Sequence, residues 1–151
     1  MIRNIIFDMV GVLMRFDTES YIEEHQLSEA DVAILRKEVF LSLEWAMQDR
    51  GFRLFVLSNT CVHWRSFWEE ITGHELFEDV VISADVGLVK PQPEIFRLAC
   101  ERFGISAGES VFIDDTPANA EAAYYVGMRA VVFHGDTAEL RRELETVLLE
   151  V

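Results

Sequence analysis

Five short apolar segments, separated by stretches suited to helices, constrain the fold of this chain most strongly. The segments are apolar on both faces, which is typical of strands in a parallel sheet that helices cover on both sides. We therefore expect an α/β fold, a three-layer α/β/α sandwich around a five-stranded parallel sheet. The expected strands are Arg3–Asp8, Arg53–Leu57, Val80–Ser83, Ser110–Ile113 and Arg129–Phe133.

The segments between these strands carry helix signals. An apolar stripe at helical spacing runs from Val32 to Met47, after a start at Ser28 and before a stop at Gly51. Proline at the first position and glycine after the last residue mark a helix over Pro93–Phe103. The other expected helices are Thr18–His25, Trp64 to about Gly73, Pro117–Val126 and Asp136–Leu149.

Length, charge and composition exclude several classes of protein. The 151 residues suffice for one domain with a sizeable core, and a net charge of −14 argues against nucleic acid or an anionic membrane as partner. No apolar run is long enough to span a bilayer, and Asp8 and Gly11 interrupt the only candidate for a signal peptide. Cys61 and Cys100 are too few for a disulfide framework. We therefore expect a cytoplasmic protein with reduced thiols.

Polar side chains stand where four of the expected strands end. Asp8 ends the first strand, Ser58-Asn59 follows the second, Lys90 lies in the loop after the third, and Asp114-Asp115 follows the fourth. The carboxyl ends of parallel strands lie at one edge of the sheet, where open α/β sheets bind ligands. Adjacent carboxylates repel each other unless a cation is near, and Mg²⁺ would relieve that repulsion. The sequence thus indicates a metal-assisted site at this edge.

Each of these clusters also has a purely structural interpretation. Asp8 could form a turn or cap a helix, which is the usual role of an aspartate after a strand. Ser58-Asn59 could cap the following helix, Lys90 could be an ordinary solvated lysine, and Asp114-Asp115 could form a surface turn. Any one of these alternatives is sufficient alone, but four polar clusters at four strand ends favour a ligand site.

Four motifs in this order resemble those of the haloacid dehalogenase superfamily. They are FDxxGVL at residues 7–13, LSNT at 57–60, KPxPEIF at 90–96 and FIDD at 112–115. The match covers residues 1–13 and 51–133, and it is most similar to the branch of sugar-phosphate phosphatases of the glucose-1-phosphatase type. The resemblance implies a Rossmann-like fold with strand order 3-2-1-4-5, which brings Asp8 next to Asp115.

The resemblance also implies a metal-dependent hydrolase with Mg²⁺ as its cofactor. Asp8 matches the nucleophile, which attacks phosphorus and becomes a transient aspartyl-phosphate. Because two anions repel, this attack needs a metal between the carboxylate and the phosphoryl oxygens. The matching metal ligands are Asp8, the main-chain carbonyl of Val10 and Asp115, and Asp114 helps to hold the metal directly or through water.

Three further residues match groups that bind the phosphoryl group of a small phosphorylated metabolite. Ser58 matches a hydroxyl that hydrogen-bonds a phosphoryl oxygen, and the main-chain amide of Asn59 lies beside it. Lys90 matches the cation that balances the anions and stabilises the transition state. This lysine also supplies the local positive charge that an acidic protein needs in order to bind a phosphate.

Val10 departs from the motif of most phosphatases in the superfamily, which have a second aspartate there. That aspartate protonates the leaving oxygen and later activates water, and losing such a group costs about 10²–10⁴-fold in rate. The carbonyl of Val10 can still bind metal, so we expect a weak phosphatase that hydrolyses small phosphate monoesters or acyl phosphates. His25 and His63 could in principle substitute for the missing acid, but nothing in the sequence places either one there.

The segment between the first two motifs is short for a capped member of the superfamily, with about fifty residues between Asp8 and Ser58. A chain that leaves one parallel strand for the next must cross over, and the helix after Ser28 is the candidate. We therefore predict a single core domain over residues 1–151, in which residues 14–50 form a truncated cap or crossover. Apolar surface exposed by a reduced cap would favour a homodimer.

Two other functions remain open. Val10 and the reduced cap favour a catalytically impaired relative that binds metal, phosphate or a partner. A haloacid dehalogenase-type hydrolase also uses an aspartate nucleophile without the second aspartate. That reaction does not need a metal, however, and the Asp114-Asp115 pair argues for one.

Overall fold

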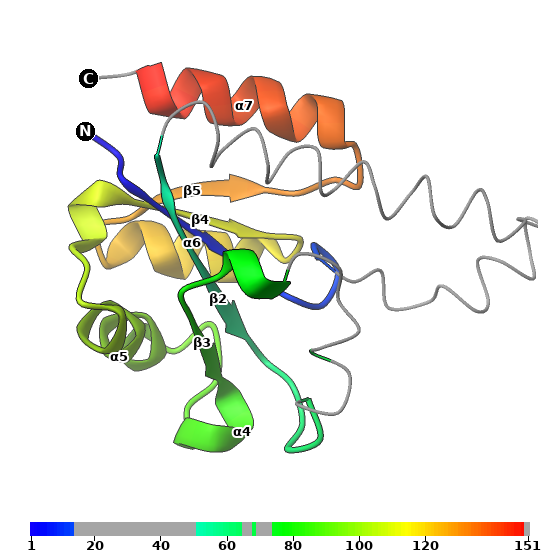
Figure 1. Cartoon of the computed structure of the whole chain (residues 1–151), viewed down its shortest axis with the longest axis vertical. Helices are drawn as coiled ribbons and strands as arrows, with labels where there is room; N and C mark the ends of the chain where they lie inside the picture. The colour runs from blue at the N-terminus through cyan, green and yellow to red at the C-terminus, as the bar shows by residue number, and fades with distance from the viewer. Residues whose placement is uncertain (14–50, 65–67, 69–73, 150–151) are drawn as a thin grey trace, which may run out of the picture.

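A five-stranded, all-parallel sheet forms the centre of the computed structural model, which describes residues 1–13, 51–64, 68 and 74–149. The order across the sheet is β3-β2-β1-β4-β5, so the predicted fold class and strand order are confirmed (Figure 1). The strands are β1 (Asn4–Phe7), β2 (Arg53–Ser58), β3 (Asp79–Ile82), β4 (Ser110–Asp114) and β5 (Arg129–Val132).

The central strand β1 pairs with β2 on one side and with β4 on the other. Phe7, its last residue, pairs with Val56 of β2 and with Ile113 of β4. The strand order therefore reverses at β1, and the residues that follow β1, β2 and β4 emerge at the same edge. This is the edge at which the sequence predicts a ligand site.

Successive side chains of the strands enter two separate cores, which explains why the strands are apolar on both faces between their first and last residues. On one face, Phe7 and Val56 pack with Leu140 and Leu144 of the last helix. On the other face, the helices α5 (Pro93–Phe103) and α6 (Pro117–Tyr125) cover the sheet, and an aromatic cluster lies between the sheet and α5. Its fully buried members are Phe55, Phe96 and Phe112, and the burial of each contributes about 1.5–3 kcal/mol.

Three helices of two turns or more cover the sheet within the described residues: α5 (Pro93–Phe103), α6 (Pro117–Tyr125) and α7 (Thr137–Leu149). The predicted bounds of α5 are confirmed, because proline opens it and Gly104, with φ of +63°, closes it. The short elements that periodicity did not predict are the helix α4 (Ser83–Val86) and the 3-10 turns His74–Leu76 and Ala107–Glu109. None of the described helices is long and apolar enough to cross a membrane.

Several predictions concern segments outside the described residues. They are the helices Thr18–His25 and Ser28–Arg50, the truncated cap over residues 14–50, and most of the helix expected after Trp64. Trp64 itself is buried and donates from Nε1 to Asp85 Oδ2 at 3.1 Å, and Trp68 packs against the same core. Trp64 is therefore a core residue, and Trp68 packs against the core while partly buried.

Candidate active site

Asp8, the residue after β1, lies at the centre of a polar cluster between β2 and β4. Its main-chain N–H donates to Ile113 O at 2.8 Å, which continues the pairing with β4 one residue past the strand. Its carboxylate is 6% exposed, and Met9 N donates to Oδ1 at 2.8 Å. The aspartate is therefore held in place by main-chain groups and is not a solvent-exposed turn residue.

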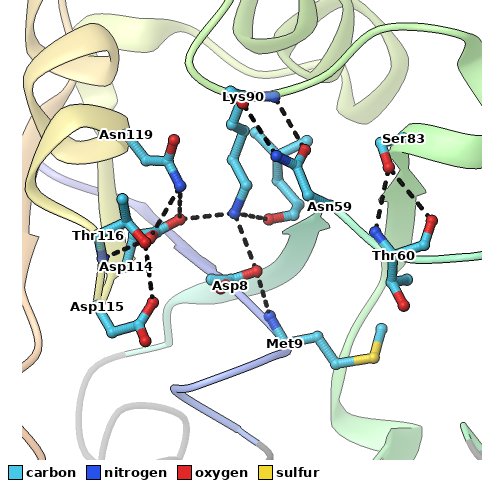
Figure 2. Close-up of polar contacts among 11 residues, drawn as sticks. Asp8, Met9, Asn59, Thr60, Ser83, Lys90, Asp114, Asp115, Thr116 and Asn119 are labelled. Carbon is cyan, nitrogen blue, oxygen red and sulfur yellow. Dashed lines mark hydrogen bonds and ion pairs between the residues drawn. The ribbon is translucent and has the colours of Figure 1, made fainter. Parts of the chain in front are cut away.

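Lys90 reaches this cluster from the loop between α4 and α5, although its neighbours in the sequence are surface residues. Its Nζ lies 2.9 Å from Asp8 Oδ1 and 2.6 Å from Asp114 Oδ2, and it donates to Leu57 O at 3.0 Å. These acceptors account for the three protons of the ammonium group. The residue is 4% exposed, so the alternative of a solvated lysine is wrong. Figure 2 shows the ammonium group between the two carboxylates.

Asp114, the last residue of β4, is fully buried and accepts hydrogen bonds on both carboxylate oxygens. Oδ1 accepts from Thr116 N at 2.8 Å, and Asn119 Nδ2 lies 3.1 Å from both Oδ1 and Oδ2. Sequence reasoning missed Asn119, which lies in the first turn of α6. The available signal was an asparagine among the alanines of that helix, on the face that packs against β4.

A third carboxylate, Asp115, completes an acidic group at the mouth of the site. Oxygen atoms of Asp8, Asp114 and Asp115 all lie within 4.8 Å of one another, and Asp115 is the exposed member. Gly11 lies against Asp115, because a Cβ atom at Gly11 would come within 2.2 Å of Oδ2. Carboxylate oxygens in this arrangement suit a hard cation such as Mg²⁺, so the predicted metal ligands fit the ion chemically.

The two predicted substrate-binding residues at the end of β2, Ser58 and Asn59, differ in their surroundings. The Ser58 side chain is fully buried, and its Oγ makes no hydrogen bond of ordinary geometry within the described residues. The hydroxyl is nevertheless close enough to Asp8 to lower the pKa of that carboxyl. The side-chain amide of Asn59 instead makes two hydrogen bonds with the main chain of Lys90.

Burial raises the pKa of the Asp8 carboxyl above its ordinary value of 3.8, and the charge of Asp114 acts in the same direction. Lys90 opposes the shift through its charge and its hydrogen bond, and the Ser58 hydroxyl opposes it weakly. The ionised form of Asp8 therefore depends on Lys90. The bonds from Met9 and Lys90 both fall on Oδ1, so Oδ2 takes part in neither of them.

The fold and the site together define an α/β protein with an acidic group and a buried lysine at the carboxyl edge of a parallel sheet. The chain belongs to the haloacid dehalogenase-like hydrolase family, whose sequence model matches residues 27–127.

The named relatives of this chain are longer proteins, and the similarity covers only part of each of them. Bifunctional epoxide hydrolase 2 of Mus musculus is 35% identical over 78 residues, which cover 52% of this chain and 14% of the hydrolase. Phosphoserine phosphatase of Thermus thermophilus is 35% identical over 86 residues, which cover 54% of this chain and 34% of the phosphatase. The chain thus spans less than two thirds of the length of both relatives.

Solved structures share the fold over almost the whole chain. A haloacid dehalogenase family enzyme from Bacteroides thetaiotaomicron, in complex with magnesium and inorganic phosphate, superposes with a TM-score of 0.70 at 22% identity. The superposition covers 92% of this chain and 98% of that enzyme. A phosphatase of the same family from Thermococcus onnurineus gives a TM-score of 0.68 at 20% identity, over 95% of this chain and 98% of that one.

Proposed function

We propose that this protein is a Mg²⁺-dependent phosphatase that hydrolyses small phosphate monoesters or acyl phosphates through an aspartyl-phosphate on Asp8. The observation that carries the proposal is the position of Lys90, buried between Asp8 and Asp114 beside the exposed carboxylate of Asp115. Burial of an ammonium group and two carboxylates costs desolvation free energy that their mutual attraction can fail to offset, so stability alone is a weak explanation for this arrangement. Stabilisation of a phosphoryl group at Asp8 would explain it.

The reaction would proceed in two displacements at phosphorus. A carboxylate oxygen of Asp8 attacks phosphorus, the bond to the leaving oxygen breaks, and that oxygen departs with the bonding electrons. Water then attacks the aspartyl-phosphate, the bond between phosphorus and Asp8 breaks, and inorganic phosphate leaves, while the proton that the water loses passes through solvent to the departed leaving oxygen. The first displacement consumes the carboxylate of Asp8 and the second restores it, so the enzyme ends the cycle unchanged.

The surrounding groups would bind and orient the phosphoryl group. Lys90 holds Oδ1 of Asp8 and supplies positive charge where negative charge develops. The hydroxyl of Ser58, which has no hydrogen-bond partner of ordinary geometry among the described residues, would donate to a phosphoryl oxygen, as would the main-chain amide of Asn59. Mg²⁺, held by Asp8, the carbonyl of Val10 and Asp115 with help from Asp114, would supply charge neutralisation between the two anions.

Val10 determines which leaving groups the site can expel. The side chain is apolar, and it packs against the core cluster that includes Phe7 and Val56. It therefore offers no proton to a leaving oxygen, and the loss of such an acid costs about 10²–10⁴-fold. Acyl and aryl phosphates have leaving groups that are weak bases. The loss of the acid would therefore slow their hydrolysis less than that of alkyl phosphates.

The names of the relatives support a phosphate ester as the substrate, since one is a phosphoserine phosphatase and one solved neighbour holds magnesium and phosphate. Within the family, the motifs favour the sugar-phosphate phosphatases of the glucose-1-phosphatase type. A truncated cap over residues 14–50 would leave the site open to the solvent and to substrates of varied shape. The same truncation would favour association of two copies of the chain.

Val10 also favours a second candidate, a catalytically impaired relative that keeps the site in order to bind phosphate, metal or a partner. In that case the ordered cluster around Lys90 would bind inorganic phosphate but would not turn over esters. A dehalogenase is less well supported. Displacement of a halide at carbon does not need a metal, whereas three carboxylates with oxygen atoms within 4.8 Å of one another favour one.

The proposal is tested by phosphate release from acetyl phosphate and p-nitrophenyl phosphate, with Mg²⁺ and with EDTA, in the wild type and in Asp8→Asn. We expect metal-dependent turnover that the substitution abolishes. Turnover that survives Asp8→Asn would contradict the assigned nucleophile. No turnover in a wild type that still binds Mg²⁺ and phosphate would support the impaired relative.

A further inference from the structure

We propose that Asn59 is a positioning residue for Lys90, and that its side chain seats the main chain of this lysine instead of contacting the substrate. The inference deepens the proposed phosphatase function, since it concerns the cation of the same site. It rests on two hydrogen bonds between residues that lie 31 positions apart in the sequence.

The side-chain amide of Asn59 pairs with both main-chain polar groups of Lys90. Nδ2 donates to Lys90 O at 2.9 Å, and Lys90 N donates to Oδ1 at 2.9 Å. This ring of two hydrogen bonds fixes the orientation as well as the distance, as a pair of strand residues would. Among side chains of this length, only asparagine offers a donor and an acceptor side by side.

Residues at the end of β2 thereby hold both the main chain of Lys90 and its ammonium group. Leu57 O accepts from the ammonium group at 3.0 Å, and Asn59, two residues further, holds the main chain. Figure 2 shows the lysine side chain extending from this main-chain pair toward Asp8 and Asp114. The four rotatable bonds of a lysine would otherwise let Nζ take many positions.

The rest of the loop offers the lysine little other support. Val89 and Gln92 bond to each other, through Gln92 N to Val89 O at 2.9 Å and Val89 N to Gln92 Oε1 at 3.1 Å. These contacts shape the loop but do not tie it to the sheet. Within the described part of the chain, the bonds from Asn59 are the ones that connect the main chain of Lys90 to β2.

Asn59→Ala and Asn59→Asp test the inference, because the first removes both bonds and the second replaces the donor with an oxygen that repels Lys90 O. Asn4→Ala is the matched control. Asn4 likewise makes two side-chain hydrogen bonds, to Glu109 O and Ser110 Oγ, but it is buried whereas Asn59 is exposed, and it lies at the far end of β1 from Asp8. Its loss should lower thermal stability without moving Lys90.

The first readout is chemical labelling, which does not depend on any activity. The chain contains two lysines, Lys37 and Lys90, so limited acetylation followed by peptide mass spectrometry reports Lys90 against an internal reference. We expect the ratio of labelling at Lys90 to labelling at Lys37 to rise about tenfold in both Asn59 variants, as the buried amine becomes accessible. Asn4→Ala should leave the ratio unchanged.

The second readout is kinetic, with acetyl phosphate and Mg²⁺. Misplacement of a catalytic group by about 1 Å can cost ~10²-fold, so we expect kcat to fall about 10–100-fold with KM within about threefold of the wild type. An increase in KM with unchanged kcat would overturn the inference, because it would indicate that the side chain binds substrate. Unchanged labelling of Lys90 in both variants would overturn it whether or not the protein proves to be a phosphatase.

Discussion

Substitution of Gly11 by alanine should separate the stability of this protein from its affinity for metal. Gly11 has φ of +90°, a conformation that costs an L-residue about 1–2 kcal/mol. For a domain of this size, that loss lowers the melting temperature by about 2–8 °C. The new Cβ atom would also lie 2.2 Å from Oδ2 and 2.6 Å from Cγ of Asp115, far inside any allowed contact.

Asp115 is exposed, so its side chain can turn away from the new methyl group at little further cost in stability. The site then loses the carboxylate that is most accessible to a cation. Since even indirect partners of a metal ligand change affinity by about 10–100-fold, we expect Mg²⁺ to bind at least ~100-fold more weakly.

Gly104→Ala provides the matched control. Gly104 has φ of +63° and nothing within 4 Å of the position of a Cβ atom, so alanine there incurs the backbone cost without the clash. Calorimetric titration with Mg²⁺ and thermal unfolding should show both variants destabilised but only Gly11→Ala impaired in metal binding. Wild-type affinity in Gly11→Ala, within about threefold, would refute the placement of Asp115 at the metal.

Three further predictions follow from the same geometry. Val10→Asp should raise turnover of alkyl phosphates about 10²–10⁴-fold and that of acetyl phosphate far less, whereas an equal effect on both would contradict the assignment of a missing acid. Because burial raises the pKa of Asp8, its ionisation destabilises the folded state as pH rises above its ordinary value of 3.8. Metal-free Asp8→Asn should therefore melt higher than the wild type at pH 7, with the difference vanishing as pH falls toward 3.8, and a lower melting temperature at pH 7 would argue against it. With a thiol-specific disulfide reagent, the exposed Cys61 should react at least about tenfold faster than Cys100, whose pKa burial raises, and equal rates would contradict that burial.

The sheet could be predicted from the sequence because its signals are local. The segments that became β1 and β4 are apolar between their first and last residues, and their bounds were predicted to within a residue. The short helix α4 was missed because Ser83–Val86 is too short to show helical periodicity.

The sequence predicted which polar residues form the site, but it did not predict which of them contact one another. Asp8 and Asp114-Asp115 stand directly after strands, so a parallel sheet alone brings them to one edge. The burial of Lys90 depends on its long-range contacts with Leu57 and Asp8, and no local pattern distinguishes it from a solvated lysine. The pairing of Asn59 with the main chain of Lys90 and that of Asn119 with Asp114 are likewise tertiary contacts without a sequence period.

A crystal structure grown with Mg²⁺ and BeF₃⁻, a mimic of the phosphoryl group, tests the central claim most directly. The account predicts beryllium bonded to a carboxylate oxygen of Asp8, Mg²⁺ shared between Asp8 and Asp115, and the ammonium group of Lys90 against a fluoride. A structure in which beryllium fluoride is bound elsewhere, or in which Asp115 lies far from the ion, would contradict it.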